Sequence, residues 1–265
     1  MFFGLCNSPA TFQKMMNEYF WDFITEGWIC IYMDDILIAA LTIPELQERT
    51  RRVLQRLLDL DLYLKLDKCQ FEVKEIDFLG MIISWNQIRM DTSKLMGIKK
   101  WTPPNTVKQV RSFLGFCNFY RKFIGHYAEI SKPLTELTKK NEPFVWTKER
   151  NEAFETLKEK FMEEPVLMMP DPTKQFILET DASKVACGAV LKQYHSDGEL
   201  HPCGYISHTF TPTEKNYDVY DRELKAVIDA IDTWKQLLRG SPHPVIIHTD
   251  HKNLAYYKEA RAMTG

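Results

Sequence analysis

The sequence has no apolar run long enough to cross a bilayer and no charged N-terminal region leading into a signal-peptide core. It has no C-x-x-C pair and no cysteine and histidine spacing typical of a metal site, so its six cysteines are expected to be reduced, structural thiols. Internal repeats and low-complexity tracts are absent as well. These absences predict an intracellular protein with no membrane partner, and they leave open whether it resides in a cytoplasmic particle or the nucleus.

Composition indicates more than one folded core. The chain has 265 residues, of which 45% are hydrophobic and 26% charged. Its formal net charge of −2 gives no indication of a nucleic-acid partner, but the charge is unevenly distributed. Residues 94–140 contain ten Lys or Arg and two acids, Glu129 and Glu136, a local balance of +8. This basic segment is a candidate contact surface for a polyanion.

The first part of the chain alternates helical and strand patterns. Apolar spacing predicts a helix over 7–24, a hairpin over 28–40, a helix over 44–64 and two short strands within 68–84. Ser8 is expected to be the N-cap of the first helix, with Pro9 at its first position. The two adjacent carboxylates, Asp34 and Asp35, are expected at the tip of the hairpin.

A break at Trp101-Thr102-Pro103-Pro104 predicts a domain boundary nearby. Beyond it the basic segment is expected to be helical, opening with a capping box of Thr106 and Gln109. The remaining pattern predicts a helix over 147–163, strands over 175–181, 186–194 and 202–210, a helix over 214–238 and a strand over 244–250. The C-terminal order is therefore β-β-β-α-β.

Asp34 and Asp35 stand between two apolar, strand-forming runs, where adjacent carboxylates repel each other and lose hydration. Asp-Asp is a poor choice for a two-residue hairpin turn, because tight turns favour pairs such as Asn-Gly that adopt positive φ. A hard divalent cation with oxygen ligands, Mg²⁺ above all, would stabilise the pair. A solvated acidic turn is the alternative that the pair alone leaves open.

Several blocks of sequence resemble the reverse transcriptases of long-terminal-repeat retrotransposons, most closely the gypsy type. The blocks are FGLCNSPATFQ (3–13), YMDD (32–35), KCQF with FLG (68–71 and 78–80), VRSFLGFCNFYRKFI (110–124) and PLTELTKK (133–140). The resemblance implies an α+β multidomain fold. Its expected parts are a partial polymerase palm (1–95), a helical thumb (96–145), a connecting segment (146–173) and an α/β ribonuclease H-like domain (174–265).

The resemblance also implies roles for residues of the polymerase part. Asp34 and Asp35 would be catalytic and would hold Mg²⁺, with Mn²⁺ as a possible substitute. The residues implied to lie near the nucleotide or the nucleic acid are Gly4, Gln13, Tyr32, Met33, Lys68, Phe78, Leu79, Gly80, Arg111, Arg121 and Lys122. For Gln13 and Lys68 the alternative is a solvated helix or strand edge, and for the thumb cations it is a solvated basic face.

A second set of acids lies in the C-terminal region. Asp181 ends its first strand, Asp250 ends its fourth, and Glu223 shares a helix face with apolar residues at i+4, i+7, i+8 and i+11. Taken singly, each acid is a turn residue or a surface charge. LETDAS, YDRELKAV and HTDHKNL resemble the gypsy-type ribonuclease H, which implies that these three acids are catalytic and hold two Mg²⁺ ions. For His248 and His251 neutral polar roles are expected.

Both ends of the sequence depart from the family pattern. The family has a further essential aspartate on a strand upstream of the FGL block, whereas this sequence starts at Met1, and Phe2 stands where proline is usual. The family's ribonuclease H has a fourth metal-site residue after a further helix, and Glu259, the one acid after Asp250, matches no motif. We therefore expect an internal piece of a Pol polyprotein, inactive or impaired as a polymerase by itself.

The resulting expectation is an RNA-directed DNA polymerase palm and thumb joined to a ribonuclease H that cleaves RNA in RNA–DNA hybrids. Its implied partners are RNA–DNA hybrid, primer–template, deoxynucleotide triphosphates and the remaining Pol segments. The alternative is a non-catalytic or domesticated remnant that binds nucleic acid without turnover. The intact Asp-Asp pair and the three C-terminal acids favour the enzyme, and the departures at the ends favour the remnant.

Overall fold

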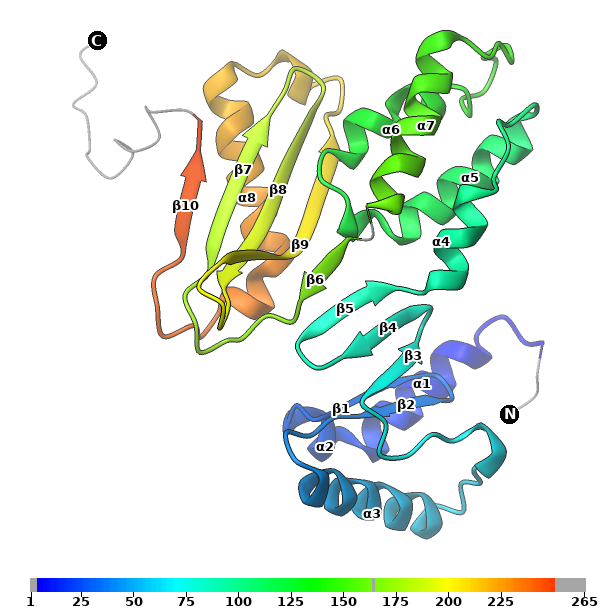
Figure 1. Cartoon of the computed structure of the whole chain (residues 1–265), viewed down its shortest axis with the longest axis vertical. Coiled ribbons are helices and arrows are strands. Elements are labelled where there is room, and N and C mark those ends of the chain that lie inside the picture. Colours follow the sequence, from blue (N-terminus) through cyan, green and yellow to red (C-terminus); the bar gives the residue numbers. More distant parts are fainter. Residues whose placement is uncertain (1–3, 164, 251–265) are drawn as a thin grey trace. The chain divides into compact units, whose positions relative to one another are not determined.

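The computed structural model describes residues 4–163 and 165–250, and the chain divides into two compact units, Met1–Leu79 and Gly80–Gly265 (Figure 1). The first unit contains the helices α1 (Ser8–Tyr19), α2 (Trp21–Thr25) and α3 (Ile43–Asp59), the strands β1 (Ile29–Tyr32), β2 (Asp35–Ile38) and β3 (Glu75–Phe78), and the 3₁₀ turn η1 (Leu66–Lys68). This agrees with the sequence pattern in element type and order.

The start and end of the first helix differ from the sequence prediction. Asn7, not Ser8, occupies the N-cap position, because the carbonyl of Asn7 already accepts from the amide of Thr11. The expected single helix over 7–24 is broken at Phe20, which has non-helical φ and ψ. The break lets the buried rings of Phe20 and Phe23 pack into the same core as Trp28. Tertiary packing therefore overrides the local helical pattern.

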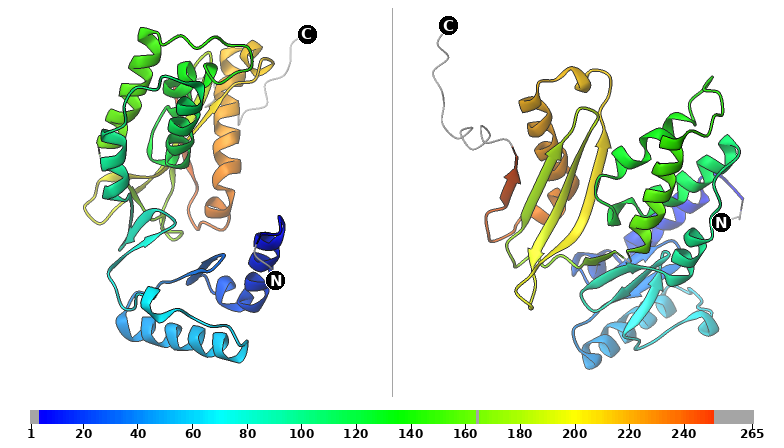
Figure 2. Two further views of the ribbon diagram at one scale, coloured as in Figure 1. Left: turned by 90° about the vertical axis from the view of Figure 1, so that its right-hand side faces the viewer. Right: turned by 45° about the horizontal axis from the view of Figure 1, so that its top comes forward.

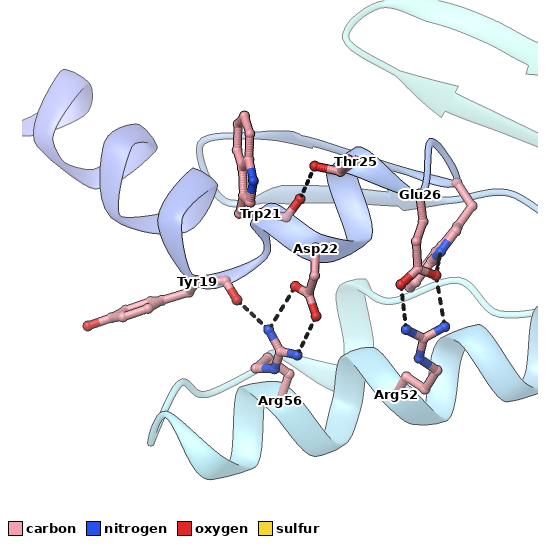
Figure 3. Close-up of polar contacts among 8 residues, drawn as sticks. Tyr19, Trp21, Asp22, Thr25, Glu26, Arg52 and Arg56 are labelled. Carbon is pink, nitrogen blue, oxygen red and sulfur yellow. Dashed lines mark hydrogen bonds and ion pairs between the residues drawn. The ribbon is translucent and has the colours of Figure 1, made fainter.

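Two arginines fasten α3 to α2 (Figure 3). Arg56 binds both carboxylate oxygens of Asp22, at 2.9 and 3.1 Å, and Arg52 binds both oxygens of Glu26, at 2.8 and 3.0 Å. The same guanidinium groups lie 4.5 and 4.6 Å from the ring centre of Phe23. A planar guanidinium can make both contacts at once, which a lysine cannot. These pairs hold α2 and α3 on the core that supports the β1–β2 hairpin.

The second unit begins with a small antiparallel arrangement and a helical region. Its first elements are β4 (Met81–Ser84), β5 (Gln87–Met90), α4 (Thr92–Lys99), α5 (Val107–Phe119), η2 (Arg121–Phe123), α6 (Tyr127–Glu136), α7 (Lys148–Met162) and β6 (Val166–Met168). β5 pairs with β4 on one side and with β6 on the other. Sequence periodicity missed α4, β5 and β6, because short elements carry little periodic signal.

One hydrophobic core joins these elements. Its buried residues run from Met90 on β5 through the helices α4 to α7 to Leu167 on β6. Phe113 on α5 and Phe154 on α7 lie at its centre, both fully buried, with ring centres 4.6 Å apart. Half of the expected capping box at α5 is present: the Thr106 hydroxyl accepts from the Gln109 amide, whereas the Gln109 side chain accepts from the amide of Asn105, the residue before the N-cap.

A four-stranded sheet forms the rest of the second unit. It contains β7 (Ile177–Ala182), β8 (Ala186–Tyr194), β9 (Leu200–Thr209) and β10 (Ile246–Thr249), in the order β10-β7-β8-β9. β10 is parallel to β7 and the other pairs are antiparallel. The helix α8 (Val219–Leu238), which follows η3 (Glu214–Asn216), covers one face of this sheet (Figures 1 and 2). The predicted β-β-β-α-β order is confirmed.

Glu214 before α8 gives the second unit a specific acid sensitivity. The amide of Thr211 donates to its carboxylate at 2.7 Å and Lys225 lies at 3.3 Å, which together lower the pKa of Glu214 to about 2. Because the folded-state pKa is depressed, this stabilisation is complete above the ordinary pKa and is lost as pH falls toward about 2. We expect Glu214→Gln to cost about 1 kcal/mol at neutral pH and nothing near pH 2, which urea unfolding across this range measures. An equal cost at both pH values would contradict the assignment.

Among the described residues, no helix has the length and apolar character needed to cross a membrane. All six cysteines are free thiols, and burial raises the pKa of the Cys187 thiol to about 12. Cys117 and Cys187 are buried, as expected of structural thiols, whereas Cys6 and Cys30 are exposed.

Candidate functional site

The β1–β2 hairpin places the first pair of acids. Tyr32 is paired with Asp35, so the connecting turn consists of Met33 and Asp34. The expected Asp34-Asp35 tip is therefore shifted by one residue: Asp35 begins β2, because the hairpin register closes at that position. Both carboxylates are exposed. They adjoin a hairpin whose residues Ile29 and Ile31 are buried, so a rigid core supports an accessible acidic turn.

Met33 has a φ of +56°, a backbone conformation that residues other than glycine adopt only at a cost in conformational free energy. The side chain of Gln13 on α1 holds it there. Its Oε1 accepts from the amide of Met33 at 2.6 Å, and its Nε2 donates to the carbonyl of Ile31 at 3.1 Å. Sequence reasoning placed Gln13 near the nucleotide. The contacts give this residue a defined structural role, fixing the turn that carries Asp34.

The other residues implied by the polymerase resemblance lie on turns and loops. Gly4 has a φ of +97°, a conformation that favours glycine. Lys68 ends η1 and is exposed, and is not part of a strand. Leu79 and Gly80 follow Phe78 with φ of +54° and +72°, the signs of a type I′ turn. Tyr120 on the thumb side donates its hydroxyl to the Gly80 carbonyl at 2.9 Å, a support that sequence reasoning missed.

The three thumb cations are in different environments. Arg111 donates to the carbonyl of Thr138 at 3.0 Å, and Arg121 donates to the side chain of Asn118 at 3.2 Å. Lys122 is half-buried with its amine 5.6 Å from the ring centre of Phe123, and burial lowers its pKa. Arg111 therefore also ties α5 to the end of α6.

The second set of acids comes from three elements of the second unit. Asp181 lies on β7, and Asp250 directly follows β10, whose last pair joins Thr249 to Thr180. Because Asp181 and Asp250 each follow a residue of this last pair, the two carboxylates lie at the same edge of the sheet, where the two parallel strands end. On β7, Leu178 packs toward α8, so by alternation Asp181 projects from the opposite face of the sheet.

Glu223 reaches this edge from α8. It is only 4% exposed, and its Oε2 accepts from the Thr249 hydroxyl at 3.3 Å. Burial raises the pKa of Glu223, and the charges of Asp181 and Asp250 raise it further, against the opposing effect of the Thr249 hydrogen bond. The three predicted acids therefore interact electrostatically, although they are far apart in sequence.

A pocket of about 370 Å³ opens on the face of the sheet that bears Asp181. Its lining includes Asp181, Asp250 and His248 from the sheet edge, and Tyr205 from β9. His126, between η2 and α6, also lines it, with its Nδ1 4.0 Å from Asp181 Oδ2. Sequence reasoning missed His126, since a lone histidine between two helical patterns carries no signal of its position.

Asp181, Glu223 and Asp250 are chemically suited to bind Mg²⁺, because three carboxylates supply the hard oxygen ligands that this ion prefers. Two buried atoms beside the set, Thr180 Oγ1 and Arg222 Nε, have no hydrogen-bond partner among the described residues. Within residues 4–163 and 165–250, however, no three His, Cys, Asp or Glu side chains are close enough together to hold a metal ion. The carboxylates are gathered but not closed into a coordination shell. Met1, Phe2, His251 and Glu259 lie outside the described residues.

Comparison with known families agrees with both regions. Residues 1–83 match the family described as reverse transcriptase (RNA-dependent DNA polymerase). Residues 146–247 match the RNase H-like domain found in reverse transcriptase.

Solved structures of the foamy viral protease-reverse transcriptase are similar to this chain. One, a dRH form in complex with double-stranded DNA, has a TM-score of 0.77 at 26% identity, over 93% of this chain and 42% of that one. Another, in complex with RNA/DNA hybrid, has a TM-score of 0.77 at 25% identity, over 100% of this chain and 36% of that one.

The chain thus comprises a reverse transcriptase region and a ribonuclease H-like domain in a mixed α+β fold. It is 39% identical to the Retrovirus-related Pol polyprotein from transposon 297 of Drosophila melanogaster, over 96% of this chain and 23% of the relative. It is 35% identical to the Transposon Tf2-3 polyprotein of Schizosaccharomyces pombe, over 95% of this chain and 19% of the relative. The chain belongs to the gypsy-type retrotransposon Pol polyproteins and spans about a fifth of the length of these relatives.

Proposed function

We propose that this chain carries the metal-binding carboxylates of two phosphoryl-transfer sites. The β1–β2 hairpin would serve nucleotide addition, and the sheet edge of the second unit would serve cleavage of the RNA strand in an RNA–DNA hybrid. The observation that supports the second site most is the placement of the acids: Asp181 and Asp250 line one pocket, and the buried Glu223 accepts from the hydroxyl of Thr249, the neighbour of Asp250. The reverse transcriptase family uses Mg²⁺, and a related foamy viral structure contains RNA/DNA hybrid.

At the sheet edge, Asp181, Glu223 and Asp250 would hold Mg²⁺ or Mn²⁺. When bound, such ions polarise a phosphoryl oxygen and activate water for in-line displacement. The chain's own residues prepare the acids for this task. Thr249 donates to Glu223 and fixes its orientation, and Arg222 donates to the carbonyl of Ser183 at 3.1 Å, which ties α8 to the turn after β7.

At the hairpin, Asp34 and Asp35 would hold the ions that stabilise charge during nucleotide addition. Gln13 keeps the turn in its positive-φ conformation and so sets the direction in which Asp34 projects. Tyr32, Met33, Gly4 and Lys68 would lie near primer–template or the incoming nucleotide. Phe78, Leu79 and Gly80 would contact the primer, and the thumb cations Arg111, Arg121 and Lys122 would contact phosphates.

Cleavage of a hybrid tests the second site directly. The purified chain is incubated with Mn²⁺ and a hybrid labelled on its RNA strand, with single-stranded RNA and duplex DNA as substrates for comparison. We expect RNA to be cut only in the hybrid, and Asp250→Asn to abolish the cutting. Asp232→Asn, an exposed acid on α8, is the matched control and should retain it. Cleavage that survives Asp250→Asn would overturn the assignment.

The second candidate is a binding module without turnover. It is favoured by the absence, within the described ranges, of three metal-ligating side chains in closed arrangement. This alternative predicts that the hybrid binds with the same affinity in Asp250→Asn as in the unmodified chain, and that no metal produces cleavage. Binding and cleavage measured side by side therefore separate the two functions.

The basic segment, residues 94–140, should make nucleic-acid binding strongly dependent on salt. Lys99 and Lys100 at the end of α4 and Lys108 on α5 are exposed cations of this segment. If four phosphates are contacted, affinity for RNA–DNA hybrid should fall roughly a hundredfold as salt rises from about 50 to about 200 mM. Fluorescence anisotropy across a salt series measures the slope.

Charge removal within the segment identifies the contact. The double variant Lys99→Gln with Lys100→Gln should lower the salt slope by about 2. Lys148→Gln serves as the control, because Lys148 is exposed on α7 outside the segment. A slope that does not change in the double variant would show that these lysines do not contact the nucleic acid.

A further inference from the structure

The loop that joins η2 to α6 brings a thumb-side histidine to the ribonuclease H-like carboxylates. His126 Nδ1 lies 4.0 Å from Asp181 Oδ2 and 3.8 Å from Glu129 Oε2. It also lies above Gly188, the residue paired with Asp181 across the sheet: a Cβ built at Gly188 would be 3.9 Å from His126 Nδ1. The imidazole therefore lies at van der Waals distance from the position of a Cβ at residue 188, on the same face of the sheet as Asp181.

The loop is fixed by contacts on both sides of His126. Gly125 packs against the ring of Tyr205, with a built Cβ 3.4 Å from that ring. The Ser207 hydroxyl accepts from the amide of Ala128 at 2.9 Å. This bond satisfies a free amide in the first turn of α6, a task that usually falls to the side chain of the N-cap residue. His126 is that N-cap residue and makes no such bond, so its side chain is not used for capping.

The conformation of His126 is not explained by capping either. Its φ is +56°, in the left-handed region, whereas N-cap residues usually adopt extended backbone. A residue other than glycine bears a cost in this region, and glycine or asparagine would fit with less strain. The structure thus holds an imidazole, in a strained backbone, at the mouth of the pocket that contains Asp181 and Asp250.

We infer that His126 positions the substrate of this site by donating a hydrogen bond to a phosphate of the RNA strand next to the point of cleavage. The inference rests on the proposed ribonuclease function. A phosphate that approaches Asp181 and Asp250 meets charge of its own sign, so metal and nearby N–H donors must hold it. His126 supplies such a donor from the helical region. Binding of the duplex by the helical region would thereby help to place the RNA strand at Asp181 and Asp250.

His126→Gly tests the inference without straining the loop, because glycine accepts the positive φ. With Ca²⁺ as the metal, we expect its affinity for a short RNA–DNA hybrid to be about five- to tenfold weaker, the net worth of one typical hydrogen bond. KM for hybrid cleavage should rise by a similar factor with kcat nearly unchanged. His126→Asn, which keeps a donor and tolerates this φ, should recover part of the loss. His243→Ala, on the exposed loop before β10, should match the unmodified chain.

A hybrid with a neutral methylphosphonate at the contacted position makes the test specific. If His126 contacts that phosphate, His126→Gly should weaken binding of this hybrid no further. Equal affinity and KM in His126→Gly and the unmodified chain would overturn the inference while leaving the proposed function intact. Conversely, a chain that binds no metal and cuts no hybrid would fail the proposed function, and the anisotropy comparison would still decide whether His126 contacts the hybrid.

Discussion

Asp181→Asn is expected to abolish the rise in melting temperature that Mg²⁺ or Mn²⁺ gives the second unit. A ligand that binds only the folded state stabilises it by mass action, by about 2.7 kcal/mol when its concentration is a hundred times its dissociation constant. Asn keeps the shape of the side chain but removes the negative charge that binds a hard cation. Differential scanning fluorimetry with and without metal measures the response.

Without metal, Asp181→Asn should not lower the stability of the second unit. The charge of Asp181 raises the pKa of the buried Glu223, so the ionised acids repel each other in the folded state at neutral pH. Removing one charge relieves that repulsion, and Asp181→Asn should be at least as stable as the unmodified chain in EDTA. Asp232→Asn, an exposed acid on α8, should change neither measurement. A metal response that persists in Asp181→Asn would show that the ions bind elsewhere.

Periodicity placed Asp181 and Asp250 at the ends of strands and Glu223 on one face of a helix, and the resemblance to ribonuclease H singled out these three acids. The structure brings them to one sheet edge. The coordination geometry is a different matter. Whether three carboxylates close into a shell depends on distances set by packing, which no spacing in the sequence encodes.

The supporting residues were beyond sequence reasoning for a physical reason. Gln13 accepts from the amide of Met33, twenty residues away, and His126 approaches Asp181, which lies on a different element fifty-five residues away. Both arrangements depend on residues other than glycine with positive φ, at Met33 and His126. Glycine, the usual indicator of such a backbone, is missing at both positions, so the sequence pattern predicts neither the positive φ nor the contact.

The expected domain boundaries at 95/96 and 145/146 fall inside one hydrophobic core. They follow from the family resemblance and from the break near residues 101–104, which indicate where elements end but not which elements pack together. The core instead joins Met90 and Leu95 to Leu157 and Leu167, so the helical region shares its interior with β5, α7 and β6. Long-range packing of this kind is carried by side-chain volume, which periodicity does not reveal.

Phe113→Ala should therefore destabilise the whole helical region together with β5 and β6, and not only α5. Phe113 is fully buried, with ring centres of Trp101 and Phe154 at 5.4 and 4.6 Å. Truncating a buried phenylalanine costs about 3–5 kcal/mol, because the surroundings only partly fill the cavity. That is a large share of the roughly 5–15 kcal/mol that stabilises a typical domain.

Hydrogen exchange during urea unfolding separates a shared core from independent domains. In Phe113→Ala the amides of β5 and α7 should lose protection by the same free energy as those of α5, since one cooperative unit opens together. Phe119→Ala is the matched control on the same helix. Its ring is 54% exposed, so its cost should stay below about 1 kcal/mol. If α7 and β5 kept full protection while α5 opened, the helical region would be an independent domain and the expected boundaries at 95/96 and 145/146 would be correct.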